Sequence, residues 1–166
     1  MKHPAYKPTL GAVLREATRG KAVSRTLTNL FWRDTERLSG TILDIGGGKR
    51  GSHYRFLPLD VNASVKIADI VPRPDTDFVL DITKESVPLP DGSVDHVFLF
   101  NILEHLSGRE WVLAETRRLL RPGGTLIGSI PFLVNVHPDP HDYVRFTKEA
   151  LERLFTEHGF TVSVVE

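Results

Sequence analysis

The segment Thr41–Gly51 constrains the fold more than any other part of this 166-residue chain. It begins with the apolar, partly β-branched run Thr41–Ile45 and then breaks into three consecutive glycines, Gly46–Gly48. This pattern predicts a buried strand that ends in a tight loop. Asp44 stands near the end of the strand, and ligands of open α/β sheets bind just outside the carboxyl ends of the strands. Because glycine has no Cβ, the loop lets a ligand approach the backbone closely.

The glycine loop alone does not select its ligand. Gly46, Gly48 and Gly51 match the dinucleotide fingerprint G-x-G-x-x-G. That fingerprint needs a helix of normal length directly after the loop to support a pyrophosphate, whereas this chain offers only a short turn, Ser52–Leu57, before Pro58. We also expect no second domain that would hold a substrate for hydride transfer. An NAD(P)-dependent oxidoreductase is therefore a weakened alternative. The purely structural alternative is a glycine-rich turn that binds no ligand.

Composition is that of an ordinary globular protein, with 40% hydrophobic and 25% charged residues, and the length suits one domain. The chain has no cysteine, so disulfides and thiolate chemistry are excluded. Its start lacks the apolar core of a signal peptide, and no run approaches the ~18 apolar residues of a membrane span. We therefore expect a cytoplasmic protein without a membrane span.

Charge divides the chain into a basic arm and an acidic domain. Residues 1–40 hold 8 Lys/Arg against 3 Asp/Glu, a net of +5, and residues 41–166 hold 13 against 18, a net of −5. Helical spacing over about 9–19 and 22–38, with Phe31 and Trp32, makes the arm too apolar for a free linker. We expect it to lie over the domain. Its charges are either merely solvated or attract an anionic substrate, and the acidic domain argues against a broad nucleic-acid interface.

Strand and helix patterns alternate through residues 41–166. Strands are predicted at Thr41–Ile45, Val65–Ile70, Phe78–Leu80, Val94–Phe100, Thr125–Ile130 and Thr161–Val165. One helix is predicted from Ser107, which has capping-box spacing to Glu110, to about Leu120, and another from Thr147 to Gly159. Such alternation predicts a Rossmann-like α/β fold, an open and mostly parallel sheet with helices on both faces.

Several short motifs follow one another over about residues 41–160. They are Leu43–Gly48, Asp69, Val79–Ile82, Val87–Asp95, Asn101–Leu106, Leu119–Gly124 and the motif His-Asp-Tyr-x-Arg-Phe-Thr at His141–Thr147. Together they resemble the class I methyltransferases that depend on S-adenosyl-L-methionine (SAM), and most closely the branch with that late motif. The resemblance implies the class I methyltransferase fold and SAM as cofactor, and it leaves the arm uncovered.

Two features depart from the family pattern. Arg50 stands where the family often has another glycine, and Gly51 would substitute with a shifted loop. The family's sheet also ends in an antiparallel strand, for which no segment precedes Glu166. We expect the sheet to lack that strand, which leaves the apolar edge Thr161–Val165, or the arm, as a contact for a homodimer.

The resemblance assigns the cofactor residues. It places Asp44, Gly46, Gly47 and Gly48 at the methionine portion of SAM. Asp69, 23 residues after Gly46, would accept hydrogen bonds from the ribose hydroxyls, a role that the same position also serves for NAD. The alternative for Asp69 is a solvated acid at the end of a strand.

Farther along, the resemblance directs Asp81 to the adenine amino group, Ile82 to the adenine ring and Asn101 to the neighbourhood of the transferred methyl. A helix-capping role for Asp81 and a turn role for Asn101 are the structural alternatives. Glu104 and His105 are assigned to the surface or to the site with equal weight.

The loop 131–146 leaves the predicted strand Thr125–Ile130 at the ligand edge of the sheet, so it is expected to form the acceptor wall. Its polar residues are His137, Asp139, His141, Asp142, Tyr143 and Arg145. Methyl transfer is an in-line displacement on an activated methyl group. Alignment of the two reactants alone lowers the barrier of such a reaction by up to ~7–11 kcal/mol. A general base adds about 10²–10⁴ in rate. His141 is the first candidate for that base, followed by Asp142 and His137.

Tyr143 and Arg145 are expected to bind the acceptor, with Arg145 able to hold an anionic group bidentately. The alternative is that Asp142 and Arg145 pair only to brace the loop. No metal is expected, because the prolines between His137 and His141 keep these two side chains off a common helical face.

These observations predict a SAM-dependent methyltransferase that acts on an oxygen or nitrogen of a small-molecule or glycan-type acceptor. A SAM-binding module without catalysis, completed by a partner, is the alternative from another class. Substitution of His141 and Asp142 separates the two, because a pure binder keeps its SAM affinity and has no turnover to lose.

Overall fold

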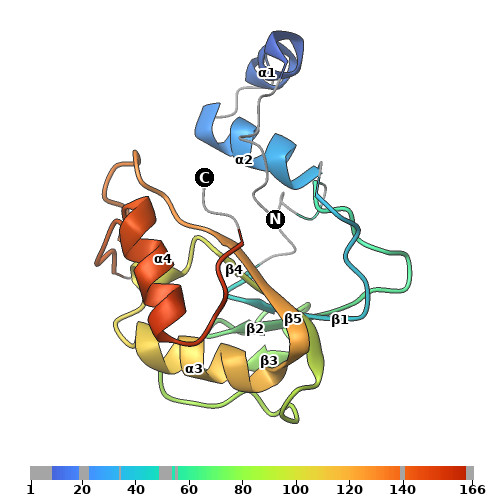
Figure 1. Ribbon diagram of the computed structural model, residues 1–166, viewed down its shortest axis with the longest axis vertical. Helices are drawn as coiled ribbons and strands as arrows, with labels where there is room; N and C mark the ends of the chain where they lie inside the picture. The colour runs from blue at the N-terminus through green and yellow to red at the C-terminus, as the bar shows by residue number, and fades with distance from the viewer. Residues whose placement is uncertain are drawn as a thin grey trace.

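A single parallel sheet organises the chain. The computed structural model describes residues 9–18, 23–33, 35–48, 54, 56–138 and 141–163, and within them five strands lie in the order β3-β2-β1-β4-β5 (Figure 1). The strands are β1 Thr41–Ile45, β2 Ser64–Asp69, β3 Phe78–Val79, β4 Val94–Phe100 and β5 Leu120–Ser129. The helices are α1 Leu10–Ala17, α2 Val23–Arg33, the 3₁₀ helix η2 Leu103–His105, α3 Arg109–Leu119 and α4 Lys148–Glu157. The predicted Rossmann-like α/β fold is confirmed.

Alternate side chains of the central strands pack into separate hydrophobic clusters, because successive residues of a strand face opposite sides of a sheet. Leu43 of β1 packs in one cluster with Leu113 of α3. Ile42 and Phe98 pack in the other cluster, against which Trp32 of α2 packs. Both faces of β1 and β4 are therefore covered, which explains their nearly continuous apolar runs.

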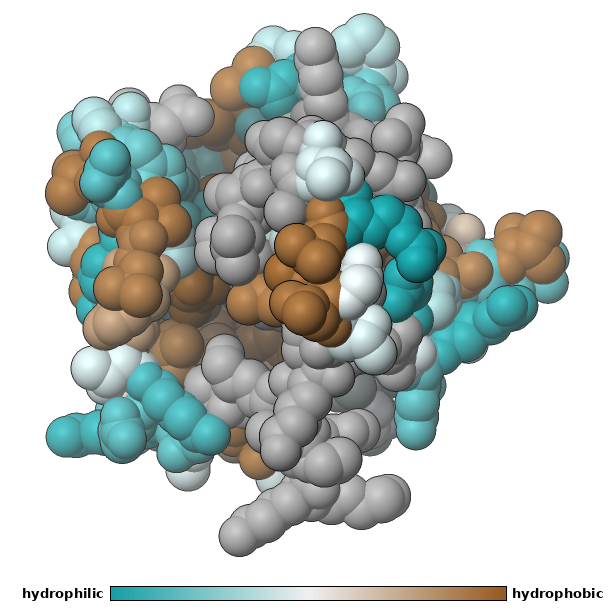
Figure 2. Space-filling model, turned by 90° about the horizontal axis from the view of Figure 1, so that it is seen from above, coloured by the Kyte–Doolittle hydropathy of each residue, from teal (hydrophilic) through white to brown (hydrophobic). Residues whose placement is uncertain are grey.

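The helical arm lies against the sheet, as its apolar residues predict. Trp32 stacks edge-on against Phe100 of β4, with ring centroids 5.6 Å apart, and Leu30 is buried. Seen from the end where α1 and α2 lie, apolar side chains are exposed near the middle of the molecule (Figure 2). Leu10 and Leu14 of α1 are 74% and 56% exposed. The division of the chain at residue 40 and a homodimer contact through the arm stay predictions.

Helix α2 ends earlier than predicted. The backbone N–H and the hydroxyl of Thr35 both donate to the carbonyl of Trp32, and this turn follows the last helical residue, Arg33. Leu38, predicted as the end of the helix, instead forms a parallel bridge with Leu59 and is buried beneath the sheet. The long-range bridge outweighs the helical spacing of Leu38 because it buries that side chain against the cluster that contains Phe98.

Two further boundaries differ from the prediction. Helix α3 begins at Arg109 with Gly108 as N-cap and no side-chain cap bond, so the predicted capping box at Ser107 is wrong. Pairing with β4 already begins at Leu120, five residues before the predicted start of the last central strand at Thr125, and the register shifts between Val94 and His96.

The predicted sixth strand is not formed at residues 161–163, and Val164 to Glu166 lie outside the described residues. Also outside them are Arg50, Gly51, Asp139 and most of the predicted turn before Leu57. Within the described ranges, all strand pairs of the sheet are parallel.

Thr147 caps α4 by accepting a hydrogen bond from the backbone N–H of Ala150 at 3.2 Å. We expect Thr147→Ala to lower the free energy of unfolding by about 1 kcal/mol, because the first turn then loses an acceptor for one of its unpaired N–H groups. Thr147→Ser keeps the oxygen and is the matched control. Chemical denaturation measures both variants, and an equal loss in the two would contradict the capping role.

Candidate functional site

The carboxyl ends of four neighbouring strands meet at one edge of the sheet. Asp44 lies near the end of β1, Asp69 at the end of β2, Asp81 just after β3 and Asn101 just after β4. Because β3, β2, β1 and β4 are adjacent and parallel, these residues share the edge at which α/β sheets bind ligands. The structure thus brings together side chains that the sequence distributes over almost 60 positions.

The glycine loop after β1 is packed so closely that side chains do not fit there. Gly46 has φ +72°, and a Cβ on it would lie 2.6 Å from Cδ1 of Ile102. A Cβ on Gly47 would lie 2.4 Å from Oδ2 of Asp44. Asp44 itself is fully buried and accepts a hydrogen bond from the Tyr54 hydroxyl. The loop therefore presents backbone, and no side chain, above the end of β1.

Asp69 ties the glycine loop to the end of β2. Its Oδ2 accepts from the backbone N–H of Gly48 at 2.9 Å, and its Oδ1 accepts from the N–H of Val71 at 2.8 Å. Arg73 Nη1 lies 3.7 Å from Oδ2, and the carboxylate is only 10% exposed. A carboxylate offers about four lone-pair sites, so these contacts leave capacity for a further donor.

Asp81 forms a cap over the turn that follows β3. Its Oδ1 accepts from the N–H and the hydroxyl of Thr83 at 3.0 and 2.6 Å, and its Oδ2 pairs with Lys84 Nζ at 2.7 Å. The hydrogen bonds from Lys84 and Thr83 lower the pKa of the Asp81 carboxyl. Ile82 is buried in the core cluster. Asp81 thus caps a turn and not a helix, and its adenine role stays a prediction.

Asn101 adopts a left-handed backbone with φ +52°, which few residues other than glycine adopt. Its N–H donates to the carbonyl of Ser129 at 2.7 Å, and its Oδ1 accepts from the Ser129 hydroxyl at 3.0 Å. Uncommon backbone geometry of this kind concentrates at functional sites. The residue therefore sits in a fixed position where β4 and β5 end.

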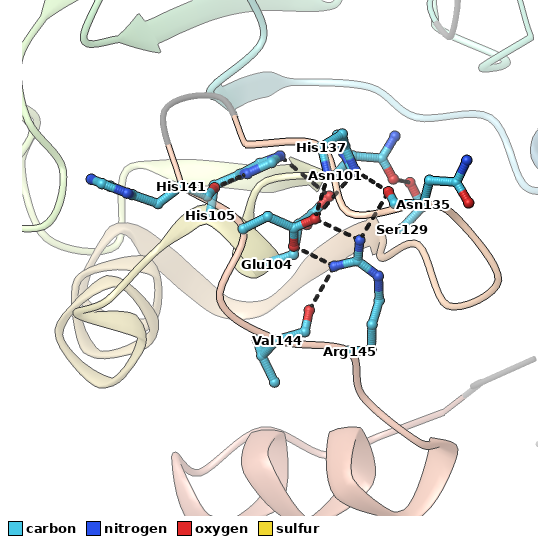
Figure 3. A network of polar contacts seen from close by, with 10 residues as sticks. Asn101, Glu104, His105, Ser129, Asn135, His137, His141, Val144 and Arg145 are labelled. Atoms are coloured by element: carbon cyan, nitrogen blue, oxygen red, sulfur yellow. Dashed lines mark hydrogen bonds and ion pairs between the residues drawn. The ribbon is translucent and has the colours of Figure 1, made fainter.

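The predicted acceptor loop folds onto the 3₁₀ helix η2. The N–H of Tyr143 donates to the carbonyl of Glu104 at 2.8 Å, and Nδ1 of His105 contacts the carbonyl of His141. The rings of His105 and His137 lie edge to face with centroids 5.2 Å apart (Figure 3). Sequence reasoning left Glu104 and His105 undecided, whereas the structure shows that both anchor this loop.

Asp142 and Arg145 brace the loop internally. Both guanidinium Nη atoms of Arg145 donate to the Asp142 carboxylate, which is nearly fully buried, and the N–H of His137 donates to Oδ2 at 2.9 Å. The Arg145 guanidinium holds the pKa of the Asp142 carboxyl well below its usual range. His141 and Tyr143 are exposed, with ring centroids 5.3 Å apart. The three-residue spacing of Asp142 and Arg145 was the available sequence signal for this pair.

Comparison with known proteins identifies similar proteins that are described as methyltransferases. The sequence profile of a family described as a methyltransferase domain matches residues 43–128, slightly more than half of the chain. A probable S-adenosylmethionine-dependent methyltransferase of Mycolicibacterium smegmatis is 42% identical over 52 residues, which make up 31% of this chain and 20% of that protein. The chain thus spans no more than a small part of this curated relative's length.

Solved structures share the fold. The 1,6-didemethyltoxoflavin-N1-methyltransferase of Burkholderia thailandensis superposes with a TM-score of 0.59 at 20% identity, over 97% of this chain and 83% of that one. A SAM dependent methyltransferase of Archaeoglobus fulgidus superposes with a TM-score of 0.58 at 18% identity, over 89% of this chain and 69% of that one. No helix among the described residues is long and apolar enough to cross a membrane.

Proposed function

Because the chain belongs to the methyltransferase-domain family, we propose that it transfers a methyl group from SAM to an oxygen or nitrogen of a small-molecule or glycan-type acceptor. One observation carries this proposal: a loop without side chains and three acidic residues share the carboxyl edge of the sheet. Carboxylates there suit the donors of SAM, which are an amino group, two ribose hydroxyls and the adenine amine. The family match does not support the NAD(P) alternative.

The residues present fit this cofactor. Gly46, Gly47 and Gly48 would hold the methionine portion with Asp44, and Asp69 would accept from the ribose. Asp81 and Ile82 would lie at the adenine, although Asp81 already caps its own turn. When bound, SAM supplies a methyl group already activated by its sulfonium, so the protein's main task is to align an acceptor near Asn101.

On the acceptor side, His141 is the proposed general base, with its imidazole exposed on the loop. Asp142 is a weaker candidate than His141, because its low pKa makes it a poor proton acceptor near neutral pH. Asp142 lies 3.3 Å from Nδ1 of His137 and so can orient that ring. Arg145 is engaged by Asp142, and an anionic acceptor would have to share its guanidinium.

Thermal unfolding with SAM, with S-adenosylhomocysteine and with NAD tests the cofactor. A ligand at about 100 times its dissociation constant adds ~2.7 kcal/mol of stability. For a domain of this size that corresponds to a rise in Tm of roughly 5–10 °C. We expect the rise with SAM and its demethylated product only. A rise in Tm with NAD alone, or with none of the three ligands, would contradict the proposal.

Asp69→Asn gives a sharper test of the ribose contact. A hydrogen bond to a charged group is worth about 1.5–3 kcal/mol, so we expect SAM affinity to fall roughly 10- to 150-fold. Asn keeps an oxygen that can still accept from Gly48, which preserves the loop. Asp60→Asn is the matched control, because Asp60 precedes β2 at the opposite end of the same strand. Calorimetric titration that finds the same affinity in both variants would remove Asp69 from the site.

A SAM-binding module without catalysis is the second candidate. The Asp142–Arg145 pair favours it, because that pair engages two of the predicted acceptor-side residues with each other. His141→Ala separates the two functions. The enzyme would lose turnover with unchanged SAM affinity, whereas the binding module would show no turnover with any acceptor in either form.

A further inference from the structure

Glu104 is a buried carboxylate that lies beside two histidines. Its side chain is fully buried, and neither of its oxygens accepts a hydrogen bond from another residue in the described part of the chain. Burial raises the pKa of the Glu104 carboxyl. Buried carboxylates are normally hydrogen-bonded, paired with a charge or bound to a metal, so this one marks a position where a cation would be stabilised.

Two imidazoles face this carboxylate. His105 Nε2 lies 3.6 Å from Glu104 Oε1, and the His137 ring stands edge to face with the His105 ring (Figure 3). One ligand atom from each of the three residues can be chosen so that all lie within 4.8 Å of one another. In a tetrahedral zinc site each ligand atom lies about 2 Å from the ion, so two ligand atoms lie roughly 3.3 Å apart. The three ligand atoms therefore need to close by up to about 1.5 Å.

The outer nitrogens of both imidazoles are already held in the way that metal ligands require. His105 Nδ1 contacts the carbonyl of His141, and His137 Nδ1 lies 3.0 Å from the carbonyl of Asn135 and 3.3 Å from Asp142 Oδ2. Carbonyls and carboxylates only accept, so in the neutral form of each ring Nδ1 is the donor and Nε2 offers its lone pair. Metal-binding histidines almost always donate their second N–H in this way.

We propose that Glu104, His105 and His137 form a site for a divalent transition-metal ion of the zinc type. Two imidazoles and a carboxylate suit zinc, cobalt or nickel, whereas magnesium and calcium prefer oxygen ligands. Three protein ligands leave one coordination position for water or another oxygen ligand. The site goes beyond the proposed methyl transfer and revises the expectation that the chain holds no metal.

Calorimetric titration of the chelator-treated full chain with zinc chloride tests the site. We expect Glu104→Gln and His137→Gln each to weaken zinc binding more than about 100-fold, beyond the 10–100-fold cost of losing an outer-shell partner. Cobalt should give the visible absorption of a tetrahedral ion in the wild type and lose it in both variants. His141→Gln is the matched control, because only the backbone carbonyl of His141 contacts the cluster.

Several results would overturn the proposal: no zinc binding by the folded wild type, wild-type zinc affinity in Glu104→Gln and His137→Gln, or binding of magnesium in preference to zinc. His137 has a 43% exposed side chain, so its variant keeps the test valid if a change at buried Glu104 impairs folding. Zinc binding is measured without SAM, and the SAM-dependent Tm shift is measured with chelator. Failure of the metal site and failure of the proposed function are therefore distinguishable.

Discussion

Gly47→Ala is expected to lower SAM affinity roughly five- to 150-fold. The added Cβ would lie 2.4 Å from Oδ2 and 2.6 Å from Cγ of Asp44, distances that no real structure tolerates. Asp44 is fully buried and bound by Tyr54, so the glycine loop must move instead. Overpacking of this kind costs about 1–3 kcal/mol, and 1.4 kcal/mol corresponds to tenfold in affinity. Calorimetric titration with SAM measures the effect.

Gly11→Ala is the matched control for this variant. Gly11 lies in α1, and a Cβ there would meet no atom within 4 Å. Alanine in an exposed helix is favoured over glycine by about 1 kcal/mol, so this variant should be slightly more stable and bind SAM as the wild type does. Wild-type SAM affinity in Gly47→Ala would show that the cofactor does not use the glycine loop.

Arg118→Met is expected to lower the free energy of unfolding by about 3 kcal/mol, the lower end of the range for breaking a buried ion pair. Arg118 Nε and Nη2 each lie 2.8 Å from an oxygen of Glu115, and Nη1 and Nη2 also donate to the carbonyls of Leu89 and Val87. Glu115 is buried, so the variant leaves its carboxylate without its cationic partner and with only neutral donors, among them the N–H of Val87 and the side chain of Ser86. Chemical denaturation measures the loss, and roughly 6–12 °C in Tm should accompany it.

The ion pair between Arg118 and Glu115 also makes the free energy of unfolding depend on pH. The hydrogen bond from Arg118 lowers the pKa of the Glu115 carboxyl in the folded protein. The stabilisation is therefore complete above the unfolded value near 4.5 and is lost as the pH falls through the lower, folded pKa. In Arg118→Met the acid-side loss of stability attributable to Glu115 should become smaller, because the largest cause of its lowered folded pKa is removed.

Two variants serve as controls for Arg118. Adding Glu115→Gln to Arg118→Met should recover part of the stability, because the amide keeps an acceptor for Val87 and removes the unpaired charge. Arg153→Met breaks an ion pair with Glu157 in which both side chains are largely exposed, and should change stability by less than about 1 kcal/mol. A loss in Arg153→Met as large as that in Arg118→Met would contradict the role of burial.

The local sequence pattern was sufficient to predict the bounds of the central strands. The bounds of β1 and β4 agree with their predicted ranges, because strands covered on both faces need nearly continuous apolar runs that stand out in a sequence. The start of α4 at Thr147 was equally visible, since an N-cap is a local side-chain contact. The parallel direction of the strands was predicted from the alternation of strands with connecting segments, and parallel neighbours gather their carboxyl ends.

Other features depend on contacts between distant segments, and no local pattern reports them. Leu38 leaves α2 to pair with Leu59, although its spacing suits the helix. His105 and His141 lie 36 positions apart and meet only because the loop after β5 folds back onto η2. The same fold-back brings His137 to Glu104 and His105.

The sequence by itself determined the α/β class, the glycine loop and the set of residues at the carboxyl edge, because each is written in local periodicity and residue type. The tertiary structure decided which polar residues are already engaged, as Asp142 is by Arg145. It also decided which buried carboxylate accepts no hydrogen bond from another described residue, as Glu104 does. The physical reason is that burial and pairing depend on side chains that only the folded loop brings within hydrogen-bonding distance.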